Sequence, residues 1–208
     1  MNASTKSDRI ISVFFHPVFI PVYGLIIILS SLTPFGILPF QVKKILFLII
    51  LINNVLLPAS LLPFLMYMNY ISTWTMNEKW ERTVPLIIAS LLYATSAYII
   101  FRFPVPWFLK SFILSVFILS VVLTIINLKW KISLHATGMG ALIALIMLLS
   151  FRMYSELFWV FVIASALAGV VLTSRLRLNL HSPRQVWYGL SLGYALTSFC
   201  LIFLQKLV

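Results

Sequence analysis

The fold is decided by residues 157–205, which read LFWVFVIASALAGVVLTSRLRLNLHSPRQVWYGLSLGYALTSFCLIFLQ. Two apolar runs, 157–174 and 186–205, are each close to the length of about 20 residues that an α-helix needs to cross a bilayer. The segment between them carries three arginines and a histidine. Ionisable groups are expensive to hold at a membrane boundary and usually serve a function there. The stretch therefore predicts two spanning helices joined by a candidate functional segment.

The same pattern extends over the whole chain of 208 residues. Hydrophobic residues make up 62% and charged residues 9% of it, and the mean hydropathy is +1.09, so its main solvent is lipid. We expect an all-α, polytopic integral membrane helical bundle of six or seven transmembrane helices, forming a single domain over residues 1–208. The apolar segments lie at about 12–32, 43–68, 85–101, 108–127, 133–150, 157–174 and 186–205.

The second apolar segment differs from the others because Asn53, Asn54, Pro58 and Pro63 interrupt it. In lipid, polar groups and backbone carbonyls freed by proline must find partners on neighbouring helices. The sequence therefore predicts a kinked interior helix there, with a broken or re-entrant segment as the alternative.

The formal net charge of +11 comes from 15 Lys and Arg against four Asp and Glu. In a membrane protein such an excess is explained first by anionic lipid headgroups and topogenic signals. The basic residues are dispersed among short loops, so we expect no nucleic-acid partner. The lone Cys200 lies in the last apolar run and can form no disulfide within the chain.

Seven crossings would place the N-terminus and the connections at about 69–84, 128–132 and 175–185 on one side of the membrane. All three histidines and most cations then share one face, whereas random scatter would divide them. We interpret His16, taken alone in Phe15-His16-Pro17, as an interfacial anchor. The residues on this side include His16, Lys79, Arg82, Lys129, Lys131, His135, Arg175, Arg177, His181 and Arg184.

Two motifs on this side carry a resemblance to a known family. Ser174-Arg175, followed after five residues by His181, resembles the third motif of the type 2 phosphatidic acid phosphatase superfamily. Ile132-Ser133-Leu134-His135 is similar to its second motif, Pro-Ser-Gly-His at the start of a helix. The resemblance covers about residues 128–195 and implies a divergent bacterial member.

The chain departs from the family pattern at three points. Gln185 stands where the family has Asp, and the Pro and Gly of the second motif are replaced. The first motif, which is Lys, six residues and then Arg-Pro, has its nearest counterpart in Lys79 and Arg82, with compressed spacing. Lys131 is an alternative source of that cation.

By resemblance, His181 is a nucleophile that forms a phosphohistidine, and His135 protonates the departing alkoxide and then activates water. Gln185 is expected one helical turn after His181, where its oxygen accepts the ring N–H without adding a charge. Neither step needs a metal or a cofactor. Phosphate oxygens are negatively charged and must be neutralised. The expected phosphate-binding residues are Arg175, Lys131, Ser133, Arg82 and Lys79.

The resemblance implies a membrane lipid phosphatase that acts on a lipid phosphate or diphosphate. It leaves the substrate open among undecaprenyl diphosphate, phosphatidylglycerol phosphate, phosphatidic acid and a lipid A phosphate. The alternative, motivated by Gln185 and the divergent first motif, is a catalytically silent relative that binds or carries a phosphorylated lipid. A small transporter is less favoured because no internal repeat is evident. The oligomeric state stays open.

The basic residues do not decide the orientation. Nine Lys and Arg fall on the side of the candidate site and six on the other, which favours a cytoplasmic site under the positive-inside rule. If Lys79, Arg82, Lys131 and Arg175 belong to the site and are set aside, five basic residues remain on the site side against six on the other, and the preference disappears. The resemblance favours a site that faces outward from a bacterial inner (cytoplasmic) membrane, and we take this as the expectation.

Overall fold

The computed structural model describes residues 3–30, 32–72, 76, 80–153 and 156–204. Within these residues the chain is helical, and seven helices are long and apolar enough to cross a membrane. The prediction of an all-α polytopic bundle is confirmed, with seven spans rather than six, and the protein is an integral membrane protein. The spans are Lys6–Ile28, Phe40–Tyr67, Thr83–Phe101, Trp107–Lys129, Leu134–Met153, Phe158–Arg177 and Pro183–Phe203.

The first span is built from three helical pieces. Helix α1 (Ala3–Phe14) ends before His16, a short 3-10 turn η1 covers Pro17–Phe19, and α2 (Ile20–Ile28) continues the crossing. Pro17 cannot continue an α-helix because it has no backbone N–H. His16 caps the turn, with its ring Nδ1 accepting from the Val18 N–H at 3.4 Å. The span thus begins at Lys6, earlier than the apolar segment 12–32 that the sequence indicates.

The second span is irregular at the asparagines that the sequence singles out, but it has the smallest buried share of the seven spans and is a peripheral helix, not the interior one that was expected. Helix α3 (Phe40–Leu51) passes through a π-helical turn, Ile52–Leu56, into α4 (Leu57–Tyr67), and the three pieces form one continuous span. Asn54 is fully buried in the π turn, and its Oδ1 accepts a hydrogen bond from Ser96 Oγ at 2.6 Å. A neighbouring helix therefore satisfies the amide oxygen of Asn54, which lipid could not, while the buried Nδ2 has no hydrogen-bond partner among the described residues.

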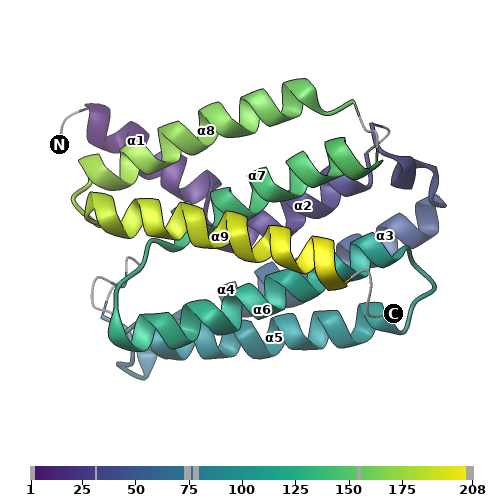
Figure 1. Cartoon of the computed structure of the whole chain (residues 1–208). Coiled ribbons are helices and arrows are strands. Elements are labelled where there is room, and N and C mark those ends of the chain that lie inside the picture. The colour runs from purple at the N-terminus through teal and green to yellow at the C-terminus, as the bar shows by residue number, and fades with distance from the viewer. Residues whose placement is uncertain (1–2, 31, 73–75, 77–79, 154–155, 205–208) are drawn as a thin grey trace.

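The remaining spans are α5 (Thr83–Phe101), α6 (Trp107–Lys129), α7 (Leu134–Met153), α8 (Phe158–Arg177) and α9 (Pro183–Phe203). They run back and forth through the bundle, with α1 lying along α8 at one edge (Figure 1). The most extensive packing joins α7 to α9. A Cβ on Gly140 or Gly193 would overlap a backbone carbonyl of the partner helix, so glycine is what lets these helices approach.

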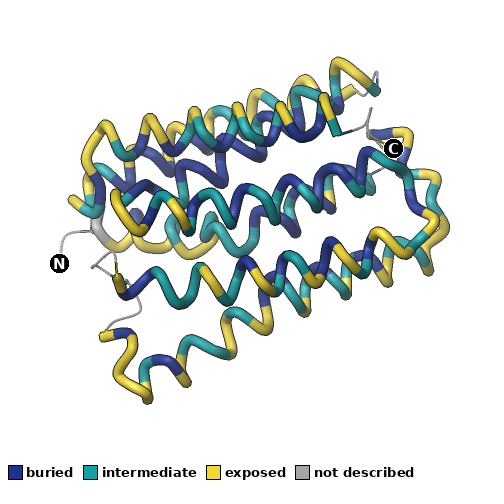
Figure 2. The backbone as a smooth tube through the Cα atoms, turned by 60° about the horizontal axis from the view of Figure 1, so that its bottom comes forward, coloured by how far each residue is buried: buried dark blue, intermediate teal, exposed yellow. Residues whose placement is uncertain are grey.

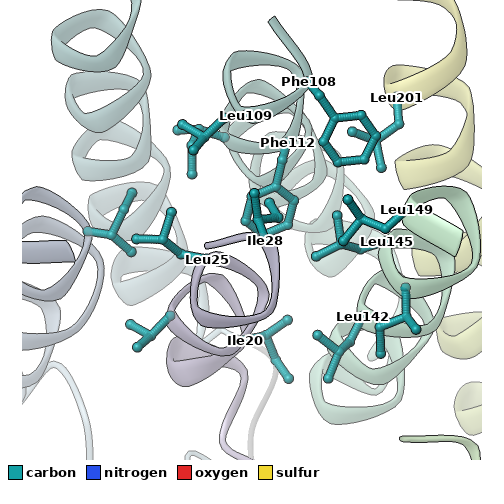
Figure 3. Packing of buried hydrophobic residues seen from close by; sticks show 14 of the residues in the cluster. Ile20, Leu25, Ile28, Phe108, Leu109, Phe112, Leu142, Leu145, Leu149 and Leu201 are labelled. Carbon is teal, nitrogen blue, oxygen red and sulfur yellow. The ribbon is translucent and has the colours of Figure 1, made fainter. Parts of the chain in front are cut away.

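The core lies where α2, α6, α7 and α9 meet. Lipid tails are as apolar as leucine, so these helices are held by close packing rather than by withdrawal from water. Buried residues follow the inward faces of the helices and exposed residues the outer faces (Figure 2). Figure 3 shows the central side chains: Ile20, Leu25, Ile28, Phe108, Leu109, Phe112, Leu142, Leu145, Leu149 and Leu201.

Candidate functional site

The short connection from α8 to α9 is held by a cap on each side. At the end of α8, Asn179 adopts a left-handed conformation with φ 52°, and the Leu180 N–H donates to the Arg175 carbonyl at 3.3 Å. This is the Schellman arrangement, which turns the chain sharply back. Ser182 then caps α9, with Pro183 in the first turn. His181 stands between the two caps and is only 8% exposed.

Gln185 fixes the protonation pattern of the His181 ring. Ser182 and Gln185 form a capping box, in which the Ser182 N–H donates to Gln185 Oε1 at 3.1 Å. Because an N–H requires an acceptor, the oxygen of the amide must be the atom that faces it. The same oxygen lies 3.1 Å from His181 Nδ1, so Nδ1 carries the proton. In the neutral ring the lone pair is then on Nε2.

Three cations from three different elements surround His181. They are Arg82 before α5, Lys131 in the α6–α7 connection and Arg175 in the last turn of α8, and each acts electrostatically on the ring. Arg82 is 6% exposed and its Nε donates to the Met76 carbonyl at 2.8 Å. Burial lowers the pKa of Arg82, and the adjacent Glu81 opposes that shift.

Arg175 is anchored on one side only. It is 7% exposed, and its Nη1 donates to Ser12 Oγ at 3.0 Å. Its Nε is buried and has no hydrogen-bond partner among the described residues. A buried guanidinium donor without an acceptor is costly, and an anion with several oxygens is the kind of ligand that would satisfy it.

Burial, together with the positive charges of Arg82, Arg175 and Lys131, lowers the pKa of His181 to about 3; the hydrogen bond that His181 Nδ1 donates to Gln185 opposes this shift. The ring is therefore neutral at pH 7. Between the unfolded pKa of 6.5 and the folded value the unfolded chain binds the extra proton, so this group makes the free energy of unfolding fall as the pH is lowered through that window.

The other two histidines lie together beside this cluster. The rings of His16 and His135 meet edge to face with centroids 5.4 Å apart. His135 Nε2 lies 3.0 Å from the Ser12 carbonyl, which can only accept, so Nε2 carries the proton and Nδ1 the lone pair. His135 lies within electrostatic range of Arg175 and His181. The interpretation of His16 as an isolated interfacial anchor thus misses its contact with His135.

Helix α1 contributes two site residues that the sequence did not single out, Asp8 and Ser12. Ser12 accepts from Arg175 through its hydroxyl and from His135 through its carbonyl. Asp8, one turn earlier, is 5% exposed and its Oδ1 accepts from Ser174 Oγ at 2.9 Å. Asp8 is one of only four acidic residues in the sequence. It lies four residues before Ser12, a spacing that places both side chains on one face of a helix, and this was the sequence feature that could have pointed to the pair.

The remaining expected residues occupy different places. Ser133 is fully buried; its Oγ accepts from the Ala136 N–H at 3.4 Å, and its N–H donates to the Gln185 carbonyl at 3.3 Å. It thereby ties the start of α7 to the start of α9. Lys79 lies outside the described residues. In the described part of the chain, no group of three or more His, Cys, Asp or Glu could hold a metal ion.

Comparison with known proteins gives no relative from which a role could be transferred. No family model, curated protein or solved structure matches this chain.

The low pKa of His181 can be measured directly. In protein whose histidines carry an isotope label, we expect NMR in micelles to show that the pKa of His181 is about 3. Arg82→Gln should raise this pKa because it removes a nearby positive charge. Arg102→Gln at the other end of the bundle is the control and should change nothing. A His181 pKa near 6.5 in the unaltered protein would contradict the buried, cation-lined setting.

Proposed function

We propose that this protein is a metal-independent phosphatase of a lipid phosphate or diphosphate and works through a phosphohistidine on His181. The observation that carries the proposal is the hydrogen bonding of the His181 ring: Gln185 Oε1 accepts from Nδ1, which leaves the lone pair of the neutral ring on Nε2. A nucleophile must be unprotonated, and here burial and three cations keep it so at neutral pH.

The cations supply what a phosphate group requires. A phosphoryl group resists attack because its oxygens are negative, so positive groups must hold them through the transition state. Arg82 stands at the N-terminus of α5, where the helix dipole disfavours a cation, and Arg175 keeps a buried donor unpartnered. A bound phosphate would relieve both costs, and Lys131 would add a third charge.

In the proposed reaction, His181 Nε2 attacks phosphorus, a P–N bond forms and the P–O bond to the leaving group breaks. His135 is the acid: the negative charge of the bound phosphate favours a proton on its Nδ1, which passes to the departing oxygen. Water then attacks phosphorus, a new P–O bond forms and the P–N bond breaks, so phosphate leaves and the lone pair returns to His181 Nε2, while the attacking water gives a proton to His135 Nδ1. The Ser12 carbonyl accepts a hydrogen bond from His135 Nε2–H, so it orients the ring in both steps.

The location of the cluster favours a lipid substrate. The histidines and cations gather where α5, α7 and α9 begin and α8 ends, at the left end of the bundle in Figure 1, and lipid headgroups lie at the end of such a bundle. We propose that this end faces outward from a bacterial inner membrane. Outside the site, the basic residues are almost equally divided between the two sides of the membrane, so the positive-inside rule does not oppose this orientation.

Phosphate release tests the proposal. The purified protein in micelles should hydrolyse at least one of four lipids: phosphatidic acid, phosphatidylglycerol phosphate, undecaprenyl diphosphate or a lipid A phosphate. A chelator should leave the rate unchanged, because no step uses a metal. Failure with every lipid would favour a catalytically silent binder, the alternative that the uncharged Gln185 supports.

Gln185→Glu is expected to raise turnover about tenfold. A charge-assisted hydrogen bond contributes about 1 to 1.5 kcal/mol more than a neutral one, and that difference corresponds to roughly one order of magnitude in rate. Glutamate also preserves the capping box with Ser182 and suits the start of a helix. Steady-state phosphate release measures the effect.

Gln185→Asp is the matched comparison for this substitution. Its side chain is one methylene shorter and reaches both the Ser182 N–H and His181 Nδ1 less easily, so its gain should be smaller. A silent binder predicts no release from any of the three proteins. If the unaltered protein is active and both acidic variants are slower, the negative charge does not assist His181.

A further inference from the structure

A groove of about 570 Å³ runs between α1 and α8, and none of the three histidines is among the residues that line it. Its walls include Asp8 and Ile11 from α1 and Gly169, Thr173 and Arg177 from α8. The volume lies in the usual range for ligand sites, about 300 to 1,000 Å³. The two helices lie side by side at the edge of the bundle (Figure 1). Ala166, Gly169 and Val170 of the lining are exposed on a spanning helix, so the groove opens toward the surrounding membrane.

The polarity of the groove changes along its length. Arg177 lies at the end of α8 and is exposed, and Thr173 follows one turn deeper. The lining then becomes apolar, with Ile11, Gly169 and Val170. From Arg177 to Ala166, the deepest lining residue of α8, the helix rises by about 16 Å. This is close to half the hydrocarbon core of a bilayer, which is about 30 Å thick.

The groove is open to an added group at its apolar end. A Cβ built on Gly169 would meet no atom within 4 Å, and Gly169 and Val170 are both exposed. On a transmembrane helix, exposed residues at this depth face lipid. A hydrocarbon chain can therefore lie against this part of α8 without any rearrangement.

Asp8 and Ser174 separate the groove from the cation cluster. Both residues line the groove, whereas Arg175, the next residue, binds Ser12, and neither Arg175 nor Ser12 is part of the lining. The Asp8 carboxylate is 5% exposed and already accepts from Ser174, so the exposed charge at the groove mouth is that of Arg177.

We propose that the α1–α8 groove binds one anionic glycerophospholipid, with its phosphate at Arg177 and one acyl chain along Gly169 and Val170. The charge at the mouth, the apolar depth and the match to half a bilayer all fit this occupant. The site is separate from the proposed phosphatase centre. A lipid seated there packs on both helices and supports the contacts of α1 with Ser174 and Arg175.

Photolabelling tests this site without relying on turnover. The full chain is placed in nanodiscs of phosphatidylcholine doped with phosphatidylglycerol that carries a diazirine on one acyl chain, and labelled residues are mapped by mass spectrometry. Phosphatidylglycerol is a phosphodiester, outside the lipid phosphates and diphosphates that the proposed reaction hydrolyses. Label is expected on the segment 166–173 of α8 and on α1 near Ile11.

Two variants and two controls decide the result. Gly169→Phe fills the groove and should therefore reduce labelling. Arg177→Gln should lower labelling about fivefold, as expected for the loss of one basic residue that binds an anionic lipid. Ile163→Phe, an exposed position of α8 outside the groove, and His181→Ala should label like the unaltered protein. Equal labelling by a diazirine phosphatidylcholine, or unchanged labelling in Gly169→Phe, would overturn the proposal. Loss of phosphatase activity with intact labelling would affect only the proposed function.

Discussion

His181→Ala is expected to abolish phosphate release, with a fall in turnover of about 10⁴-fold or more, because it removes the atom that forms the covalent intermediate. The fold should be retained. The capping box between Ser182 and Gln185 persists without the imidazole, so the lost hydrogen bond costs only about 0.5 to 1.5 kcal/mol of stability. Turnover and thermal unfolding of the purified variant, measured in the same micelles, check both statements.

A chemical trap gives an independent reading of the nucleophile. Acid-labile phosphate should be found on His181 when a reaction with a radiolabelled lipid phosphate is quenched under alkaline conditions, and it should be absent from His181→Ala. Phosphate trapped on His135 or His16 would reassign the nucleophile. An active His181→Ala protein would exclude the phosphohistidine mechanism altogether.

The number and positions of the spans were readable from the sequence because each apolar run is near the length of a bilayer crossing. The start of the first span was not. Residues 6–11 include Lys6, Asp8 and Arg9 and have little apolar character, yet they are helical and lie along α8. Asp8 is accommodated there because Ser174 donates to it across the interface. A hydropathy pattern contains no information about such a partner.

The candidate site was predictable where the chemistry is local. Ser182-Pro183 and Gln185 predict a capped helix start with Gln185 one turn from His181, and the structure has this capping box and hydrogen bond. The contacts of Arg175 and His135 with Ser12 join residues more than 120 positions apart. They depend on how α1 packs across the bundle, which neither spacing nor periodicity of the sequence encodes.

Arg82 belongs to the compressed counterpart of the first motif. Two spans separate it from His135 along the chain, yet its charge acts on both His181 and Arg175. If it holds phosphate oxygens in the transition state, Arg82→Gln should lower turnover by about two to three orders of magnitude, as loss of one transition-state donor commonly does. Arg82→Lys should recover only part of this, since Lys keeps the charge without the planar fork.

Arg102→Gln and Arg152→Gln are the matched controls, because both residues are exposed and lie at the opposite end of the bundle. Each should leave turnover within about twofold of the unaltered protein, since charges screened by solvent contribute little.

The NMR titration separates an effect on phosphate from an effect on the nucleophile. Arg82→Gln raises the His181 pKa toward 6.5, so a rate loss caused only by ring protonation would be recovered at pH 8. A loss that persists at pH 8 assigns Arg82 to the phosphate itself, and equal losses in Arg102→Gln would mean that the site is not confined to one end of the bundle.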